Sequence, residues 1–75
     1  MRDLIEYIAR SLVDDTDAVR VTVSRDRTMK IYKLAVAPDE TGRVIGKDGK
    51  IANALRVLIR AAATRTGEHA TLKIM

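Results

Sequence analysis

Apolar and polar residues alternate along the chain with two different periods, and the first of these predicts a helix. Near the start of the 75 residues, apolar side chains recur at helical spacing, at Leu4, Ile5, Ile8 and Leu12. Asp3 stands at a predicted N-cap, with Glu6 three residues later as in a capping box. The helix is expected to end near Val13, because the side chains of residues 14–17, three Asp and one Thr, compete for backbone hydrogen bonds and favour a solvated turn.

A period of two follows and predicts a pair of strands. Three valines alternate with polar residues up to Ser24, the pattern of a half-buried strand: Val19, Val21 and Val23. Residues 25–28 are polar and predict a turn. A second strand is expected to run through Ala37, with one face made of Tyr32, Leu34 and Val36 and the other of Lys33 and Ala35. Pro38 ends this strand because it cannot donate a ladder hydrogen bond.

The rest of the chain predicts two helices and a final strand. Asp39 and Glu40 suit the first turn of a short helix that runs toward Ile45. Residues 51–66 form a long helical segment that ends before Gly67. Its predicted core stripe is Ile51, Leu55, Leu58 and Ala62, and its predicted polar stripe is Asn53, Arg56, Arg60 and Thr64. The last strand, residues 70–75, would bury Ala70, Leu72 and Ile74.

The predicted order is therefore α-β-β-α-α-β. This order favours an α+β domain in which helices pack on one face of a three-stranded sheet. Seventy-five residues are enough for one small domain, so residues 1–75 are expected to form a single one.

The junction between the two later helices, residues 42–50, reads GRVIGKDGK and is the richest in candidate chemistry. Gly46 and Gly49 bracket Lys47 and Asp48, so the backbone can turn with positive φ and remain free of Cβ atoms where a ligand approaches. Lys50 then opens the long helix, whose first turn adds unpaired N–H groups. Loop and helix end together favour an anion such as a phosphate.

Spacing separates this loop from other phosphate-binding motifs. The Walker A motif has four residues between its first glycine and Gly-Lys, followed by Ser or Thr. Here Gly42 and Gly46 enclose three residues and Asp48 follows Lys47, so that motif is excluded. The dinucleotide pattern G-x-G-x-x-G is also absent. The remaining pattern is G-x-x-G between helices, flanked by the aliphatic residues Val44, Ile45 and Ile51, as in loops that clamp about four nucleotides.

Composition and charge narrow the function further. Apolar residues make up 47% of the chain but include no Phe or Trp and only two Tyr, which disfavours RRM and OB-fold modules because these stack bases on aromatic rings. Residues 41–65 carry six basic groups and one acidic group, whereas residues 1–17 carry two basic and five acidic groups. The net charge of +4 is thus concentrated around the glycine loop, as in nucleic-acid binders. Charge alone leaves open the alternative of plain solvated helix faces.

Catalysis and metal binding have little support in this sequence. His69 is the only histidine and lies beside Glu68 at the start of the last strand, and neither Ser11 nor Ser24 has a second histidine from which to build a relay. The acidic residues 14–17 lack the glycine and later glutamate of a calcium loop. We therefore expect no enzyme activity, no cofactor and no metal. The absence of cysteine and of a membrane-length apolar run is compatible with a cytoplasmic location.

The whole chain resembles a type II KH domain, and more narrowly the small bacterial KH-domain RNA-binding proteins of the KhpA type. The resemblance is carried by LIEYIARSLVDD, by V-A-P before the short helix, by GRVIGKDGKIANALR and by the alanines at 61–63. It implies binding of single-stranded RNA, and a role as a global RNA chaperone or small-RNA partner. It also implies action together with a larger protein that carries its own KH domain.

In this interpretation Gly46 and Gly49 let the RNA backbone approach, and Lys47 holds a phosphate. The full set of candidate RNA-binding residues is Arg43, Val44, Gly46, Lys47, Asp48, Gly49, Lys50, Asn53 and Arg56. Val44 is expected to line an aliphatic groove, with Ile45 and Ile51 in the core. Small residues on the long helix (Ala54, Val57 and Ala61) also suggest a homodimer. The alternative function is a KH-like protein-interaction or ribosome-associated scaffold module with little RNA binding of its own.

Overall fold

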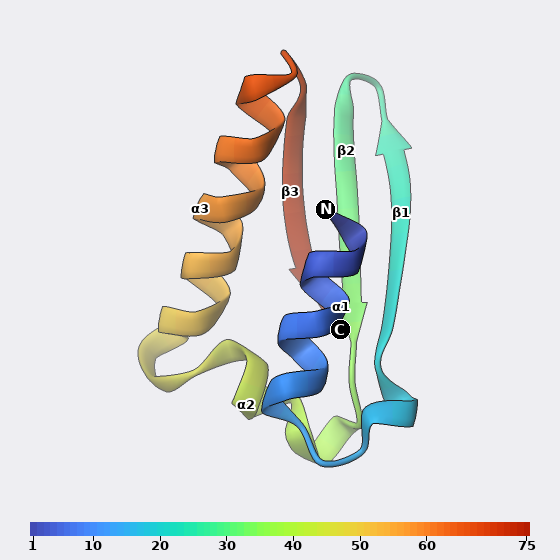
Figure 1. The fold of residues 1–75 in the computed structure, drawn as a ribbon, viewed down its shortest axis with the longest axis vertical. Helices are drawn as coiled ribbons and strands as arrows, with labels where there is room; N and C mark the ends of the chain where they lie inside the picture. Colours follow the sequence, from blue (N-terminus) through green and yellow to red (C-terminus); the bar gives the residue numbers. More distant parts are fainter.

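The computed structural model describes all 75 residues, and its element order confirms the predicted α+β class. Figure 1 shows the arrangement of the three helices and the sheet. The helices and strands are α1 (Arg2–Leu12), β1 (Arg20–Asp26), β2 (Met29–Ala35), α2 (Thr41–Ile45), α3 (Lys50–Arg65) and β3 (His69–Ile74). Three short 3₁₀ turns connect them: η1 (Thr16–Ala18), η2 (Pro38–Glu40) and η3 (Lys47–Gly49). No helix is both long enough and apolar enough to span a membrane.

The sheet has the order β1-β2-β3, with β2 at its centre. β1 and β2 form an antiparallel hairpin, whereas β3 pairs parallel to β2 after the chain has crossed over through α2 and α3. Helices α1 and α3 lie side by side over the same face of the sheet (Figure 1). The hairpin turn is shorter than expected, because β1 continues to Asp26 and only Arg27 and Thr28 remain outside the strands.

The inner face of the sheet and the two helices enclose an aliphatic core. As predicted, the alternate residues Tyr32, Leu34 and Val36 are buried, although β2 ends at Ala35, two residues before the predicted end at Ala37. Leu72 of β3 and Val21 of β1 join them, whereas Val23 is exposed, contrary to its predicted place in the buried set. The alternation along β1 therefore predicts which face of the strand is buried, but it does not predict where the burial ends. The core no longer covers this face at Val23.

Helix α1 begins two residues earlier than its sequence pattern predicts. Met1 is the N-cap, no side chain caps the helix, and Asp3 lies within the first turn, so the predicted capping role of Asp3 is wrong. The fully buried residues are Ile5 and Ala9, while Leu4 is exposed. The helix ends at Leu12 with Val13 as its C-cap, as predicted.

Helix α3 is rotated relative to the predicted stripe. Its buried residues are Ala52, Leu55 and Ile59, whereas Leu58 is 49% exposed. The predicted core position of Leu58 is therefore wrong. The next residue, Ile59, faces the sheet instead. Gly67, with φ of +73°, follows the helix in the left-handed conformation and ends it as predicted.

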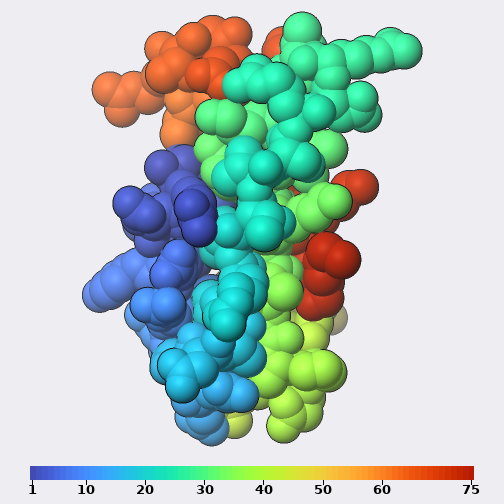
Figure 2. Space-filling model, turned by 90° about the vertical axis from the view of Figure 1, so that its right-hand side faces the viewer, coloured from blue at the N-terminus to red at the C-terminus, as the bar shows by residue number.

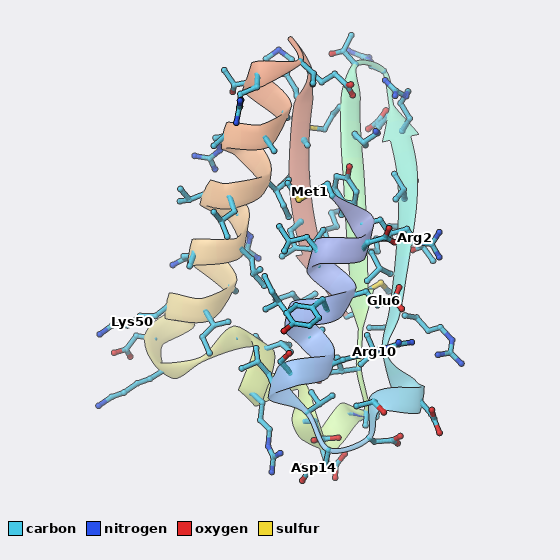
Figure 3. All side chains as sticks on the ribbon, in the orientation of Figure 1. Met1, Arg2, Glu6, Arg10, Asp14 and Lys50 are labelled. Atoms are coloured by element: carbon cyan, nitrogen blue, oxygen red, sulfur yellow. The ribbon has the colours of Figure 1, made fainter.

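Both free edges of the sheet are contacted by arginines from the helices. Arg2 of α1 donates from Nε to the carbonyl of Val21 on β1 at 3.1 Å, and Figure 3 shows this side chain reaching past the helix toward the strand. Arg56 of α3 donates from Nε to the carbonyl of Leu72 on β3 at 3.3 Å. Arg56 thus lies over the edge of β3. Its predicted place on the polar stripe had required it to point away from the sheet.

Candidate functional site

The glycine loop joins α2 to α3 at the end of the molecule opposite the β1–β2 hairpin (Figure 1). We call residues 46–49, with the sequence GKDG, the GxxG loop. Gly46 closes α2 by donating its N–H to the carbonyl of Gly42 at 2.9 Å, and the N–H of Gly49 returns to the carbonyl of Gly46 at 3.1 Å. These two bonds fold the loop into a single tight turn that leads directly into α3.

Gly46 is required at its position for two independent reasons. Its backbone lies at φ +78° and ψ 172°, a region that is essentially restricted to glycine. A Cβ atom placed on it would also come within 2.7 Å of Cγ1 of Ile51 in the first turn of α3. The packing of Ile51 against the bare backbone therefore fixes how the loop enters the helix.

Asp48 and Gly49 adopt left-handed conformations that both residue types tolerate. Gly49 has φ of +75°, and a Cβ there would meet only Nδ2 of Asn53 at an ordinary contact distance of 3.6 Å. Asp48 has φ of +57°, and Asp is among the few residues besides glycine that visit this region. The acid at position 48 thus has a backbone reason to be present in a basic segment.

The loop presents polar groups to solvent. The side chains of Lys47 and Asp48 are exposed, as the turn predicted, and neither forms an ion pair. The hydrogen bonds of the loop use the N–H groups of Gly46, Gly49 and Lys50, which leaves those of Lys47 and Asp48 without an acceptor. Figure 3 shows Lys50 extending into solvent beside the turn. Exposed ammonium groups and free N–H donors are therefore gathered at one point.

The two aliphatic residues before the loop exchange their expected roles. Val44 is fully buried within the core cluster, so the expectation that it lines a ligand groove is contradicted. Ile45, expected in the core, is 37% exposed. Consecutive positions on a helix point about 100° apart, and the short α2 directs Val44, not Ile45, toward the core. Ile51 is partly buried and packs against the core, as expected.

Arg43 is engaged by two carboxylates. Its Nη1 lies 3.1 Å from Oδ2 of Asp14 and 3.3 Å from Oε2 of Glu40, although about half of the Arg43 side chain is exposed. A phosphate would have to compete with both acids for this guanidinium. Arg43 also joins α2 to the turn after α1, and its predicted attraction for RNA stays a prediction.

Glu40 is the one buried charged residue, and sequence reasoning placed it only in the first turn of a short helix. Its Oε2 accepts the N–H of Asp14 at 2.6 Å and its Oε1 accepts the N–H of Asp15 at 2.9 Å. These bonds tie the acidic turn after α1 to the turn that precedes α2. The spacing of Glu40 and Arg43 at i and i+3 was the only local signal of this network.

The last two predicted site residues lie one turn apart on α3. Asn53 is exposed, and its Oδ1 accepts a hydrogen bond from Nη1 of Arg56 at 3.2 Å. Together with the bond from Arg56 to Leu72, this holds the guanidinium between the GxxG loop side of α3 and the edge of β3. Residues 14–17, with the sequence DDTD, are exposed, and no cluster of three metal-ligating side chains is present.

Comparison with known proteins identifies relatives along the full chain. The family model described as "KhpA/KhpB, KH domain" matches residues 2–74. The protein named RNA-binding protein KhpA from Clostridium acetobutylicum is 43% identical over 75 residues, which cover all of both chains. Its namesake from Halalkalibacterium halodurans is 44% identical over 75 residues and 99% of that protein, and the one from Treponema pallidum is 45% identical over 73 residues, or 97% of this chain and 91% of that protein. No solved structure matches significantly.

Proposed function

The chain belongs to the KhpA/KhpB KH-domain family, and from that premise we propose that it binds short single-stranded RNA through the GxxG loop. The family is an RNA-binding and non-enzymatic one, in line with the sequence analysis. The observation that carries the proposal is the exposed loop itself. Its backbone at Gly46 has a conformation that only glycine adopts, and the N–H groups of Lys47 and Asp48 have no acceptor.

Recognition of the backbone would use three kinds of contact. The free N–H groups of Lys47 and Asp48 and the ammonium groups of Lys47 and Lys50 donate to phosphate oxygens, and the N-terminus of α3 adds a favourable partial charge. Arg56 supplies a third cation between α3 and β3. Such contacts position a strand without reading its bases.

Base contacts would come from apolar groups beside the loop. Because Val44 is buried, we assign its expected role to Ile45, the exposed aliphatic side chain next to Gly46. Contacts with an aliphatic surface suit unpaired bases, which a duplex does not offer, and KH loops clamp about four nucleotides. We therefore expect a single strand to bind better than its duplex, with low affinity from so few contacts.

The test compares Lys47→Asp with the parent protein. This change places two adjacent acids where a phosphate would lie, so binding of a labelled single-stranded RNA should be lost. The thermal melt should hardly move, because Lys47 is exposed and unpaired. Arg27→Asp is the matched control: it changes the charge equally in the hairpin at the other end of the sheet, where Asp tolerates the positive φ of +58°.

Fluorescence anisotropy at several salt concentrations completes the experiment. With Arg43 held by acids, Lys47, Lys50 and Arg56 would neutralise about two to three phosphates, so log K against log salt should have a slope of about −1.4 to −2.1. Equal binding by Lys47→Asp and the parent, or tighter binding of the duplex, would contradict the proposal. A scaffold module, the alternative function, would show neither binding nor slope.

We also propose that the chain acts as an RNA chaperone with a protein partner, either a second copy or a larger KH-containing protein. Weak, backbone-directed contacts permit the rapid exchange that a chaperone needs. In support of a partner, α1 and α3 expose neighbouring apolar side chains, and Leu4 and Leu58 line one shallow hollow between them. Val57 on α3 is 60% exposed, and the family model takes its name from two proteins, KhpA and KhpB.

A further inference from the structure

The outer face of the sheet is open, and its residues are mainly polar, with Met29, Ile31 and Ala35 of β2 as apolar members. Because side chains alternate along a strand and Val21, Leu34 and Leu72 point into the core, their neighbours in sequence point outward. These outward residues include the row Thr22, Lys33 and Lys73, which the register places directly side by side across all three strands. In Figure 2, α1 lies on one side of the strands, and no helix covers the opposite side, where β3 reaches the edge of the molecule.

The row contains two lysines in adjacent positions. Lys33 of β2 and Lys73 of β3 are direct partners in the parallel ladder, and neither forms an ion pair. Like charges directly opposite each other destabilise a sheet. Arg20 lies on the same face, diagonal to Lys33, but its Nη1 donates to the carbonyls of Asp17 and Val19 at 2.6 and 2.9 Å, so the free cations of the row are the two lysines. The fold therefore retains two adjacent like charges on this face, an arrangement that is unfavourable by itself.

No side-chain carboxylate on this face lies close to the two lysines. The outward-facing acid of β1 is Asp26, four residues beyond Thr22, which corresponds to about 13 Å along the strand. That distance exceeds the Debye length of about 8 Å at physiological salt, so Asp26 does not screen the lysines. The two lysines are thus complementary to an extended polyanion.

The positive charge of the two lysines continues from the candidate RNA site. Arg56 contacts the carbonyl of Leu72 at the edge of β3, and Lys73 is the next residue along that strand. Arg56 itself lies six residues from Lys50, about 9 Å along the axis of α3. Positive groups therefore run from the GxxG loop over the edge of β3 and onto the open face of the sheet.

We propose that Lys33 and Lys73 form a second contact surface for the ribose–phosphate backbone of the RNA strand that leaves the GxxG loop. This inference rests on the proposed function and extends it from about four nucleotides to a longer strand that bends over β3. The hydroxyls of Thr22, Ser24 and Thr71 on the same face can hydrogen-bond phosphates and 2′-hydroxyls. No Phe, Tyr or Trp lies among these outward residues, so the surface binds backbone without base preference.

The test measures binding of 4-nucleotide and 10-nucleotide single strands by the parent protein and by Lys33→Gln/Lys73→Gln. A 10-nucleotide strand gains several binding registers on the loop alone, which raises affinity but leaves the salt slope unchanged. If Lys33 and Lys73 neutralise two more phosphates of the longer strand, the slope of log K against log salt becomes steeper by about 1.4. We expect the parent to show this steeper slope with the longer strand only, and the double variant to lose it, with affinity on the order of tenfold weaker at 0.1 M salt.

Stability provides a second readout. Removing the like-charge pair should leave Tm unchanged or raise it, so weaker binding would not come from unfolding. The control Arg10→Gln/Arg27→Asn removes the same net charge from α1 and from the hairpin, and should keep the steep slope. An unchanged slope in Lys33→Gln/Lys73→Gln, or an equal loss in the control, would overturn the second surface.

Failure of the loop is distinguishable from failure of the sheet surface. If the 4-nucleotide strand binds the parent and not Lys47→Asp, the loop proposal stands whatever the lysines of the sheet do. If the parent binds both strands with the same slope, the loop binds RNA and the second surface is wrong. If acidic proteins but no RNA bind the lysine face, the second surface is wrong as well.

Discussion

The buried carboxylate of Glu40 should contribute more to stability than any other charged group in the chain. Its two oxygens accept the N–H groups of Asp14 and Asp15, and Glu40 is only 6% exposed. Hydrogen bonds to a charged acceptor contribute about 1.5–3 kcal/mol each. Because Asp14 and Asp15 are themselves exposed, water can replace part of what is lost, so we expect Glu40→Ala to cost about 2–3 kcal/mol.

This loss is large for a chain of 75 residues. At about 4–8 °C per kcal/mol, Tm should fall by roughly 10–20 °C in a melt followed by circular dichroism. Glu40→Gln keeps one acceptor oxygen and should lose about half as much. The control Glu6→Ala removes an acid from the i,i+4 pair with Arg10 on α1, where such pairs contribute about 0.3–0.5 kcal/mol.

Arg43 should depend on the same network. In a double-mutant cycle of Glu40→Ala with Arg43→Ala, the coupling should stay below about 1 kcal/mol, because Arg43 is half exposed and its ion pair is screened by solvent. The backbone bonds of Glu40 would then account for most of the loss. A Tm for Glu40→Ala within about 3 °C of the parent, less than one such bond would give, would refute this reasoning.

Two further predictions concern the loop and the helical face. In a urea titration, Gly46→Ala should destabilise the protein by about 2 kcal/mol or more, because alanine is strained at this positive φ and its methyl group would meet Ile51. The control Gly42→Ala has open space around it in α2 and should be neutral or stabilising. If α3 carries a homodimer interface, light scattering should show a dimer that Val57→Glu converts to a monomer; a monomer mass for both at high concentration would exclude self-association.

Local signals predicted most of the fold. Period-two alternation located the strands, and the glycine spacing located the loop with its exposed Lys47 and Asp48. Gly67 ends α3 as predicted, because a left-handed residue there requires no knowledge of the tertiary structure. The resemblance to KhpA-type KH proteins is confirmed by the family match along residues 2–74.

The rotation of the helices could not be predicted from periodicity alone. In α3 the apolar residues Ile51, Leu55, Val57, Leu58 and Ile59 cover more than half of the helix circumference. Which arc is buried then depends on where the sheet lies, and the structure selects Leu55 and Ile59 together with Ala52. Alanines are easily overlooked as core residues, yet Ala9 and Ala52 are buried where a helix comes close to its neighbours.

The network around Glu40 was invisible for a different reason. The carboxylate oxygens of Glu40 accept backbone N–H groups that lie 25 and 26 residues away in sequence. Every residue except proline has such a donor, so the sequence does not indicate which one is used. A buried glutamate also contradicts the usual exposure of charged residues. The pairing of Arg43 with Asp14 was equally hidden, since only the tertiary fold brings this acid near, whereas its pair with Glu40 lies at i,i+3.

The arginines at the two edges of the sheet have a consequence for the behaviour of the protein at high concentration. A small open sheet has two unpaired strand edges, and such edges template association with the edges of other molecules. Here Arg2 occupies a carbonyl of β1 and Arg56 a carbonyl of β3, so an incoming strand must first displace a charged guanidinium. Arg56, which borders the proposed RNA site, should therefore also hinder association of β3 with the edge strands of other molecules.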